Sequence, residues 1–395
     1  MTDYVLADDL SGALEAGAAF RAAGRRVVLP LCGAQDLPDA LTVISTETRN
    51  AAPGDAAAAV RRVLAEQRRK GATLRLKKID STLRGPVAVE IEAMMVELAP
   101  PLVVFCPANP LTGRTVIGGR LLVHGVPLER TDFRDDPYWP ATTSDIGAML
   151  EGQGHVHSVR ADRADWQAEA ANILNGVRRD RGGPGLFVPD VETMDDLRLL
   201  VELGQRFGHQ LVWVGSGALA SVLAGQPTTR FEARVSPPVL VVCGSRNPAA
   251  LRQVAALKAE SGTEVMELEI SGPVALEASR VAQSCARHRI TALHFKIPEG
   301  LPDAAVRLQS WIAALLTQVQ GSTALGLLYL TGGETAQRVC EALGGVRLEV
   351  IGEMEPGVVL SQLEFSERAP LPILSKPGGY GDPHAIIRQL ENVMK

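Results

Sequence analysis

Short apolar runs alternate along the chain with longer stretches in which apolar residues recur every three or four positions. The apolar runs of the first half have the length of buried strands and lie at residues 4–7, 26–31, 41–45 and 102–106. The stretches between them with helical spacing are 13–23, 56–69 and 87–98. The order strand, helix, strand, helix predicts a mostly parallel sheet with helices on both faces.

The second half of the chain repeats this alternation after an interruption. Residues 225–238 contain three prolines and have no periodicity, which is typical of a linker. At 395 residues the chain is also too long for one ordinary hydrophobic core. We therefore predict an α/β fold with two α/β domains, 1–226 and 237–395, mostly parallel sheets and a ligand cleft between the domains.

Composition narrows the class of partner. The net charge of −5 and the aromatic content of 4% argue against a nucleic-acid partner, which needs basic or stacking surfaces. No uncharged apolar run reaches the ~18 residues of a membrane span, and the N-terminus has no signal-peptide pattern, so we expect no membrane association. The five cysteines form no CxxC pair, which is typical of reduced thiols in a cytoplasmic protein.

Residues 76–85 concentrate the chemistry of the first half. Two lysines, Lys77 and Lys78, are followed by Asp80, Ser81 and Arg84 between a predicted strand and a predicted helix. This density suits a small, anionic, hydroxylated ligand, with Arg84 gripping a carboxylate bidentately and a lysine acting as a point charge. The alternative is a solvated turn in which Ser81 or Thr82 caps the helix.

Other polar residues follow neighbouring predicted strands. Asp8 and Asp9 come directly before Ser11 and Gly12, and Arg49 follows the strand at 41–45. Ligands of parallel sheets bind beyond the carboxyl ends of the strands, so we expect these groups to converge. One carboxylate would orient or deprotonate a substrate hydroxyl and the other would cap the helix or hold a metal through water. The alternative is that Asp9 or Ser11 serves only as an N-cap.

Three glycine-rich turns mark the second half. They contain Gly244 and Ser245; Gly332, Gly333, Glu334 and Thr335; and Lys376, Gly378 and Gly379. None is a Walker A loop or a GxGxxG fingerprint, and each alone is also explained as a tight turn. Together they favour phosphate contacts from backbone N–H groups, and hence nucleotide binding. His155 and His157 lack a third ligand nearby, so no metal site is predicted.

These motifs resemble the four-carbon acid sugar kinases over nearly the whole chain and in the same order. The opening Asp8-Asp9-Leu10-Ser11-Gly12-Ala13 and the stretch 77–85 resemble the most distinctive motifs of that family. Residues 107–115 and 125–128 are similar to its middle section, and 244–245, 331–335, 352–357 and 376–382 to its nucleotide-binding half. Asn109, Thr46 and Asn247 depart from the family pattern, which bears on the choice of substrate.

The resemblance implies ATP-dependent phosphorylation of a hydroxyl on threonate, erythronate or a keto derivative, with ATP and Mg²⁺ as cofactors. It implies a substrate domain at 1–226 and an ATP domain at 237–395. On this reading Asp9, Asp80 and Arg84 are catalytic, with Asp9 accepting the proton of the attacking hydroxyl. The substrate-binding residues are Asp8, Ser11, Gly12, Arg49, Lys77, Lys78 and Ser81. The nucleotide-binding residues are Gly244, Ser245, Gly332, Gly333, Glu334, Thr335, Lys376, Gly378 and Gly379.

Two other classes of protein stay open. A nucleotide-linked oxidoreductase of a small hydroxy acid would also have two α/β domains, but its GxGxxG fingerprint is missing. A non-catalytic sugar-acid-binding protein would need only the first domain. The sequence leaves the oligomeric state open, a homodimer included.

Overall fold

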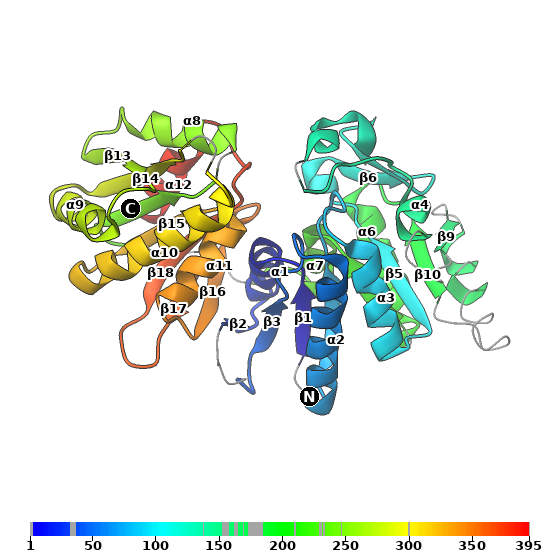
Figure 1. Ribbon diagram of the computed structural model, residues 1–395. Helices are drawn as coiled ribbons and strands as arrows, with labels where there is room; N and C mark the ends of the chain where they lie inside the picture. The colour runs from blue at the N-terminus through cyan, green and yellow to red at the C-terminus, as the bar shows by residue number, and fades with distance from the viewer. Residues whose placement is uncertain are drawn as a thin grey trace. The chain divides into compact units, whose positions relative to one another are not determined.

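The chain folds into two compact units, which are described separately (Figure 1). The computed structural model describes residues 3–31, 37–136, 138–151, 158–161, 165–168, 170–172, 185–208, 211–228, 231, 234–245, 247–298 and 301–394. Unit 1 comprises Met1–Ala23 and Pro38–Pro227, and unit 2 comprises Gly24–Leu37 and Thr228–Lys395. His155, His157 and Cys32 lie outside the described residues.

Unit 1 is built on a parallel sheet, as the alternation predicts. Its strands run in the order β3-β1-β4-β11-β5-β10-β9, and every pair of neighbours is parallel. Their bounds are β1 Asp3–Ala7, β3 Leu41–Ser45, β4 Thr73–Lys78, β5 Leu102–Cys106, β9 Ser158–Ala161, β10 Gly185–Pro189 and β11 Leu211–Gly215. The carboxyl ends of β1, β3 and β4 therefore lie side by side at one edge of the sheet.

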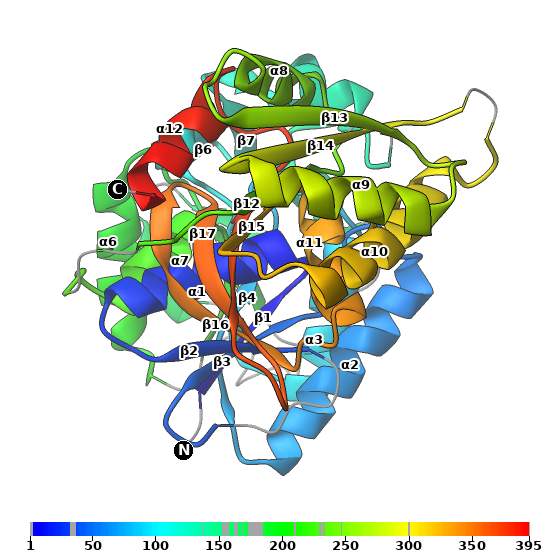
Figure 2. The ribbon, with the colours of Figure 1, turned by 90° about the vertical axis from the view of Figure 1, so that its left-hand side faces the viewer.

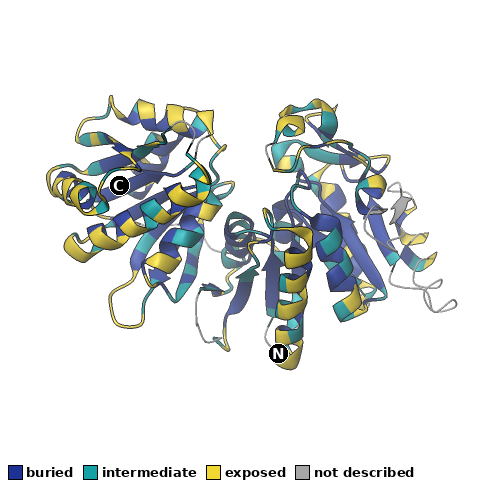
Figure 3. Ribbon diagram, viewed as in Figure 1, coloured by how far each residue is buried: buried dark blue, intermediate teal, exposed yellow. Residues whose placement is uncertain are grey.

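The helices of unit 1 form two packed groups. One group joins α1 and α6 to α7, and the other joins α2 and α4 to α3. Their bounds are α1 Leu10–Ala22, α2 Pro53–Arg69, α3 Val87–Leu98, α4 Ile146–Glu151, α6 Met194–Gln205 and α7 Gly217–Ala224. Since a parallel sheet is covered on both faces, its strands are largely buried: every residue of β5 is buried, and so is every residue of β1 after the first (Figure 3).

A small antiparallel sheet follows β5. It consists of β6 Arg114–Ile117, β7 Arg120–Val123 and β8 Val126–Pro127. The chain turns between β7 and β8 at His124 and Gly125, which both have positive φ, 49° and 78°. Two short 3₁₀ turns follow, Leu128–Arg130 and Asp132–Asp135, and Thr131 connects them: its Oγ1 donates to the Leu128 carbonyl and accepts from the Phe133 N–H.

Unit 2 has a mixed sheet. Its order is β13-β14-β12-β15-β18-β17-β16-β2, parallel from β13 to β18 and antiparallel from β18 to β2. The strands are β2 Val27–Pro30, β12 Val239–Cys243, β13 Thr263–Glu269, β14 Ile290–Lys296, β15 Leu327–Thr331, β16 Arg347–Glu355, β17 Val358–Glu364 and β18 Leu371–Lys376. The helices α9 Val274–Arg287, α10 Ala304–Ser322 and α11 Gly333–Ala342 pack in a row, and α8 Pro248–Leu257 packs on α12 Ala385–Val393 (Figure 2).

Strand β2 departs from the expected division of the chain. The sequence places residues 26–31 in the first domain, whereas β2 pairs with β16 and clusters with unit 2. Leu29 lies opposite Leu348, and the Leu31 N–H donates to the Val346 carbonyl at 2.9 Å. An apolar run predicts a strand but not its partner, so the chain order alone did not reveal this excursion.

Within the described residues no helix is long and apolar enough to cross a membrane.

Candidate active site

The expected convergence of polar groups after β1, β3 and β4 is confirmed. Ala7, at the end of β1, pairs with Ser45 of β3 and with Lys78 of β4. Asp8 and Asp9 follow the first strand, Glu47 to Arg49 the second, and Asp80 to Arg84 the third. These residues, with Lys78 and the first turn of α1, are called the acid cluster below.

Arg49 holds the two adjacent aspartates. Its Nε and Nη2 donate to the two oxygens of Asp8 at 2.8 and 3.0 Å, and its Nη1 donates to Asp9 Oδ2 at 2.6 Å. Asp9 Oδ1 also accepts the Gly12 N–H at 2.8 Å, so Asp9 is the N-cap of α1. A Cβ at position 12 would lie 2.8 Å from that oxygen and 3.1 Å from Lys78 Nζ, which explains the glycine. The capping alternative and the cluster are therefore both true of Asp9.

The two aspartates differ in acidity. Burial disfavours the charged form of Asp8, but Arg49 and the neighbouring lysines outweigh it and lower the pKa of Asp8. Burial also acts on Asp9, and together with the charge of Asp8 it raises the pKa of Asp9 despite Arg49. Two carboxyls whose environments push their pKa values apart suit different roles, and Asp9 is the better proton acceptor of the two.

The lysines are fixed by carboxylates from helices. Lys77 Nζ lies 2.6 Å from Glu90 Oε2 of α3, with both side chains at most 1% exposed. Lys78 Nζ lies 3.0 Å from Glu15 Oε2 of α1 and donates to the Ile79 carbonyl. The expectation that Lys77 contacts the substrate is therefore not supported, since its ammonium group is enclosed within unit 1. Lys78 remains beside Asp9 and Gly12.

The Arg84 guanidinium is already engaged. Its Nε and Nη2 donate to the two oxygens of Asp80 at 2.9 and 3.0 Å, the bidentate grip that the sequence assigns to a ligand carboxylate. Although burial opposes it, the charges of Arg84 and Arg49 hold the pKa of Asp80 well below its ordinary value. Asp80 and Arg84 thus form an internal ion pair at the end of β4. Ser81 and Ser11 are half-buried, and neither hydroxyl has a hydrogen bond to another described residue.

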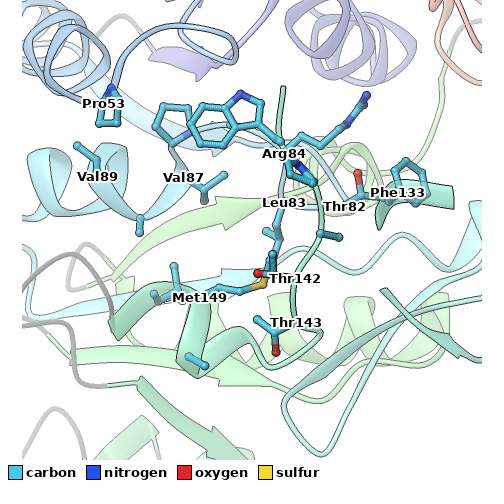
Figure 4. Close-up of a pocket in the computed structure, with 18 residues that line it drawn as sticks. Pro53, Thr82, Leu83, Arg84, Val87, Val89, Phe133, Thr142, Thr143 and Met149 are labelled. Atoms are coloured by element: carbon cyan, nitrogen blue, oxygen red, sulfur yellow. The ribbon is translucent and has the colours of Figure 1, made fainter. Parts of the chain in front are cut away.

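A cavity of about 310 Å³ opens beside Arg84 (Figure 4). It lies between the first turn of α3 and the segment 139–150, and its walls are largely apolar apart from Arg84 and three threonines. Figure 4 shows Val87, Phe133 and Met149 among the side chains around it. Such walls do not match a polyhydroxylated acid, so the acid cluster is the better candidate for that ligand.

Sequence reasoning assigned no role to Glu47, the acidic residue after β3. Its φ of 51° is left-handed, which is uncommon for a residue other than glycine and occurs most often at functional positions. Ser45 Oγ donates to its Oε1 at 2.5 Å. Although the side chain reaches solvent, the surrounding protein and the charge of Asp9 raise the pKa of Glu47 to about 7. No sequence signal distinguishes it, because backbone strain is not visible in a pattern.

The three glycine-rich turns meet in unit 2. They follow β12, β15 and β18, which are neighbouring parallel strands. A Cβ added to Gly244 would lie 2.3 Å from Thr335 Oγ1, and one added to Gly378 would lie 2.3 Å from Ser245 Oγ. Gly332 has a φ of 96° and donates its N–H to the Lys376 carbonyl at 2.8 Å. This close approach of the three turns requires glycine at these positions.

Hydrogen bonds of buried polar side chains also fix the conformation of these turns. Thr335 Oγ1 accepts from Gln309 Nε2 of α10 at 3.0 Å. Lys376 is 1% exposed, and its Nζ donates to the carbonyls of Pro377 and Tyr380 at 2.9 and 2.8 Å. Burial lowers the pKa of Lys376 to about 8. The expected contact of Lys376 with a phosphate is not what its hydrogen bonds indicate, because the ammonium shapes the third turn instead.

Two residues noted as departures have local roles. Asn247 Oδ1 accepts the Ala249 N–H at 2.9 Å and caps α8. Thr46 Oγ1 donates to the Ala7 carbonyl at 3.0 Å and so connects β3 to β1. The third, Asn109, is buried after β5.

Known proteins match this division of the chain. Residues 4–223 match a family model described as a sugar-binding N-terminal domain, and residues 240–386 match one described as a nucleotide-binding C-terminal domain. D-threonate kinases from Salmonella typhimurium and Bordetella bronchiseptica are 30% and 31% identical, over 96% and 98% of this chain and 96% of each relative. A solved Salmonella typhimurium structure, 21% identical, covers 98% of both chains with a TM-score of 0.81 and shares the fold.

The fold and the two sites thus define a two-domain α/β protein with a sugar-binding half and a nucleotide-binding half. The chain belongs to the four-carbon acid sugar kinase family, as the sequence motifs indicated.

Proposed function

We propose that this protein is an ATP-dependent kinase that phosphorylates a hydroxyl of a four-carbon sugar acid, with D-threonate as the first candidate. The observation that carries the proposal is the full-length relationship to three D-threonate kinases, at 30–32% identity over 96–98% of the chain. A D-erythronate kinase and 3-oxo-tetronate kinases are 25–27% identical, so these acids are the next candidates.

The acid cluster of unit 1 would hold the sugar acid. Asp9 would accept the proton of the attacking hydroxyl, which is supported by its raised pKa and by its place beside Lys78 and Gly12. Asp8 and Arg49 would keep Asp9 in position through the hydrogen bonds described above. Asp80 and Arg84 would present a fixed pair of charges to the substrate's hydroxyls. Ser11 and Ser81 have hydroxyls available for further hydrogen bonds.

The glycine turns of unit 2 would hold ATP. Backbone N–H groups in the first turn of α11 would contact phosphate oxygens, and Ser245 lies close to Gly378 of the third turn. The reaction requires the γ-phosphate and the attacking hydroxyl to meet in line, so positioning by both units contributes most of the catalysis.

Mg²⁺ fits this site as a companion of the nucleotide. Among the described residues no group of three or more metal-ligating side chains occurs, so the protein would supply at most one or two carboxylates and the phosphates the rest. Glu334 and Asp382 are the acidic side chains near the turns, and they pair with Arg338 and Arg388, so the phosphate oxygens would hold most of the ion. When bound, Mg²⁺ neutralises charge on the phosphate oxygens.

We place the enzyme in the cytoplasm, where ATP is available, and propose that it forms a homodimer. A Bordetella bronchiseptica relative of known structure, 28% identical with a TM-score of 0.50, is a domain-swapped dimer with bound citrate. Sedimentation of the purified protein tests the dimer.

The test of the function is ATP consumption with Mg²⁺ across D- and L-threonate, D- and L-erythronate and their keto forms. We expect turnover of one or two acids, D-threonate foremost. Asp9→Asn keeps a side chain that caps helices but removes the base, so kcat should fall about 100-fold or more with little change in KM.

Asp135→Asn is the matched control, since this aspartate is exposed and pairs only with Arg134 at the surface among the described contacts. It should leave both constants unchanged. If no acid is phosphorylated and ATP does not bind, the proposed function is wrong. If Asp9→Asn keeps its kcat, Asp9 is not the proton acceptor.

A further inference from the structure

The basic side chains around the acid cluster differ in how they are neutralised. Lys77 pairs with Glu90, Lys78 with Glu15, and Arg49 with Asp8 and Asp9. Arg84 pairs with Asp80 and lies 3.7 Å from an oxygen of Asp136. All these guanidinium and ammonium groups are therefore occupied by the protein's own carboxylates.

Arg114 is the exception in this part of the molecule. It opens β6, and its Nη1 donates to the Thr112 carbonyl at 2.6 Å, but no carboxylate of the described residues pairs with it. Its Nε is also buried and has no hydrogen-bond partner among the described residues. Its guanidinium lies 6.0 Å from the centre of the Phe133 ring, and that of Arg84 lies 5.9 Å from the same ring. Arg114 thus brings an uncompensated positive charge close to Arg84 and Asp80.

The charges that act on Arg114 agree with its position close to Arg84 and Asp80. Burial lowers the pKa of Arg114, and the charges that act on it are those of Asp80, Arg84 and Glu15. Asp80 and Glu15 are already paired, with Arg84 and Lys78. A guanidinium stays charged under any physiological condition, and the Thr112 carbonyl and two carboxylates that pair elsewhere offset only part of the burial cost of Arg114, so a bound anion would lower that cost further.

Asn109 is coupled to Arg114 through the backbone. The Asn109 N–H donates to the Arg114 carbonyl at 2.9 Å, and the Arg114 N–H donates to the Asn109 carbonyl at 3.0 Å. Asn109 is only 6% exposed, yet its Oδ1 has no hydrogen-bond partner among the described residues. Buried amides are normally hydrogen-bonded, so an orphaned one calls for an explanation.

The sheet topology places Asn109 and Arg114 near the edge of the unit 1 sheet that also carries the acid cluster. Asn109 follows β5, whose Cys106 lies opposite Gly215 of β11, and Gly215 lies opposite Lys78 of β4. Ser216 Oγ donates to the Ala108 carbonyl at 2.5 Å and so fixes the loop before Asn109. A guanidinium without a carboxylate partner and an amide oxygen without a hydrogen bond among the described residues therefore lie beyond the carboxyl ends of the same parallel strands as the acid cluster, where ligands of such sheets bind.

We propose that Arg114 binds the carboxylate of the sugar acid and that Asn109 hydrogen-bonds the neighbouring hydroxyl or carbonyl oxygen of that acid. This inference rests on the proposed function and deepens it. The sequence predicts that Arg84 binds this carboxylate. Because Arg84 already pairs with Asp80, Arg114 takes that role instead. The amide of Asn109 then distinguishes the group beside the carboxylate, because an amide N–H donates to a hydroxyl or a keto oxygen and an amide oxygen accepts only from a hydroxyl.

The competing explanation is purely structural. Arg114 also closes the 109–114 turn through the Thr112 carbonyl. A structural role would lower stability and affect both substrates alike, whereas a binding role affects the acid alone.

The experiment compares wild type, Arg114→Ala, Arg114→Lys and the control Arg134→Ala with D-threonate and with threitol, which lacks the carboxylate. Arg134 lies in the segment that carries Phe133, is 67% exposed and pairs with Asp135, so its removal changes the net charge equally. We expect Arg114→Ala to raise the acid KM about 10- to 100-fold, while the ATP KM stays within about twofold.

Selectivity for the acid over threitol should fall by the same factor, and Arg114→Lys should recover part of it because the charge remains without the fork. Asn109→Ala should alter the ratio between D-threonate and its 2-keto form while the ATP KM stays constant. An unchanged acid KM in Arg114→Ala, or equal changes in both KM values with a lower Tm, overturns the inference and leaves the kinase intact. If wild type phosphorylates no tetronate, the proposed function fails, and the inference with it.

Discussion

Different groups follow the carboxyl ends of the two sheets: charged side chains in unit 1 and glycine-rich turns in unit 2. In unit 1 the residues after β1, β3 and β4 are charged, and Asp8, Asp9, Asp80 and Arg84 are fixed by hydrogen bonds between side chains. In unit 2 the residues after β12, β15 and β18 are largely glycine, and the turns approach so closely that a Cβ would collide. A sugar acid offers hydroxyls at particular positions, whereas a phosphate accepts hydrogen bonds from any suitably aimed amide. We infer that side-chain identity sets the specificity of unit 1 and backbone shape that of unit 2.

Each unit also contains a lysine that is almost completely buried. Lys77 in unit 1 is 2.6 Å from the Glu90 carboxylate, whereas Lys376 in unit 2 donates to two backbone carbonyls. Lys77 is one half of an ion pair, whereas Lys376 stabilises a turn. This difference in partners determines how much stability the protein loses when each lysine is removed.

The largest expected effect is that of Lys77→Met. It leaves Glu90 buried without its partner, which should lower the free energy of unfolding by about 3–5 kcal/mol. Urea unfolding measures this loss, and the acid KM of the folded protein should not change. The double variant Lys77→Met with Glu90→Gln should recover much of the stability, because Thr48 Oγ1 donates to Glu90 and can donate to the amide oxygen as well. If Lys77→Met is stable and has a raised acid KM, Lys77 contacts the substrate after all.

The next effect concerns pH. Burial lowers the pKa of Lys376 from 10.5 to about 8, so between these values the unfolded chain binds more protons than the folded one. The free energy of unfolding of unit 2 should therefore rise as the pH rises through this window, by at most about 3 kcal/mol. Scanning calorimetry of wild type and Lys376→Met, from about pH 7 to about pH 10, isolates the contribution as the difference between the two pH profiles. Parallel profiles would mean that the ammonium is not desolvated.

Much of this organisation was predictable from the sequence because it depends on local patterns. The alternation of apolar runs predicted the α/β class, and polar residues directly after the runs predicted that charged groups converge at one edge of the unit 1 sheet. The glycines at 244, 332 and 378 predicted tight turns, and the structure shows that the strands before these turns are neighbours in the sheet. Chain order and residue type were sufficient for these features.

The partners of the charges were not predictable, because they depend on side-chain direction in three dimensions. Glu90 lies in the first turn of α3, where an acidic residue is common in any helix, so nothing in its surroundings indicates that it points at Lys77. Arg84 has the spacing of a ligand-binding arginine and yet closes on Asp80 four residues earlier. Arg114 stands alone in the sequence with no other charged residue beside it, yet it has no carboxylate partner among the described residues and is for that reason the stronger candidate.

The smallest effect concerns the backbone of unit 2. Gly244→Ala introduces a Cβ 2.3 Å from Thr335 Oγ1 and 2.9 Å from its Cγ2, so the first and second turns must separate. The amides aimed at the nucleotide then shift by a fraction of an ångström, which should raise the ATP KM about tenfold, or about 1.4 kcal/mol. Steady-state kinetics with ATP varied at saturating acid measures the change.

The control is Gly321→Ala in α10, where no heavy atom lies within 4 Å of the added Cβ. It should leave the ATP KM unchanged and stabilise the helix slightly, because alanine is the better helix former. If side-chain identity governs unit 1 and backbone shape governs unit 2, Gly244→Ala leaves the ranking of four-carbon acids unchanged while it weakens ATP. A changed ranking would mean that the nucleotide turns also select the acid, and the division of labour between the two sites would then be wrong.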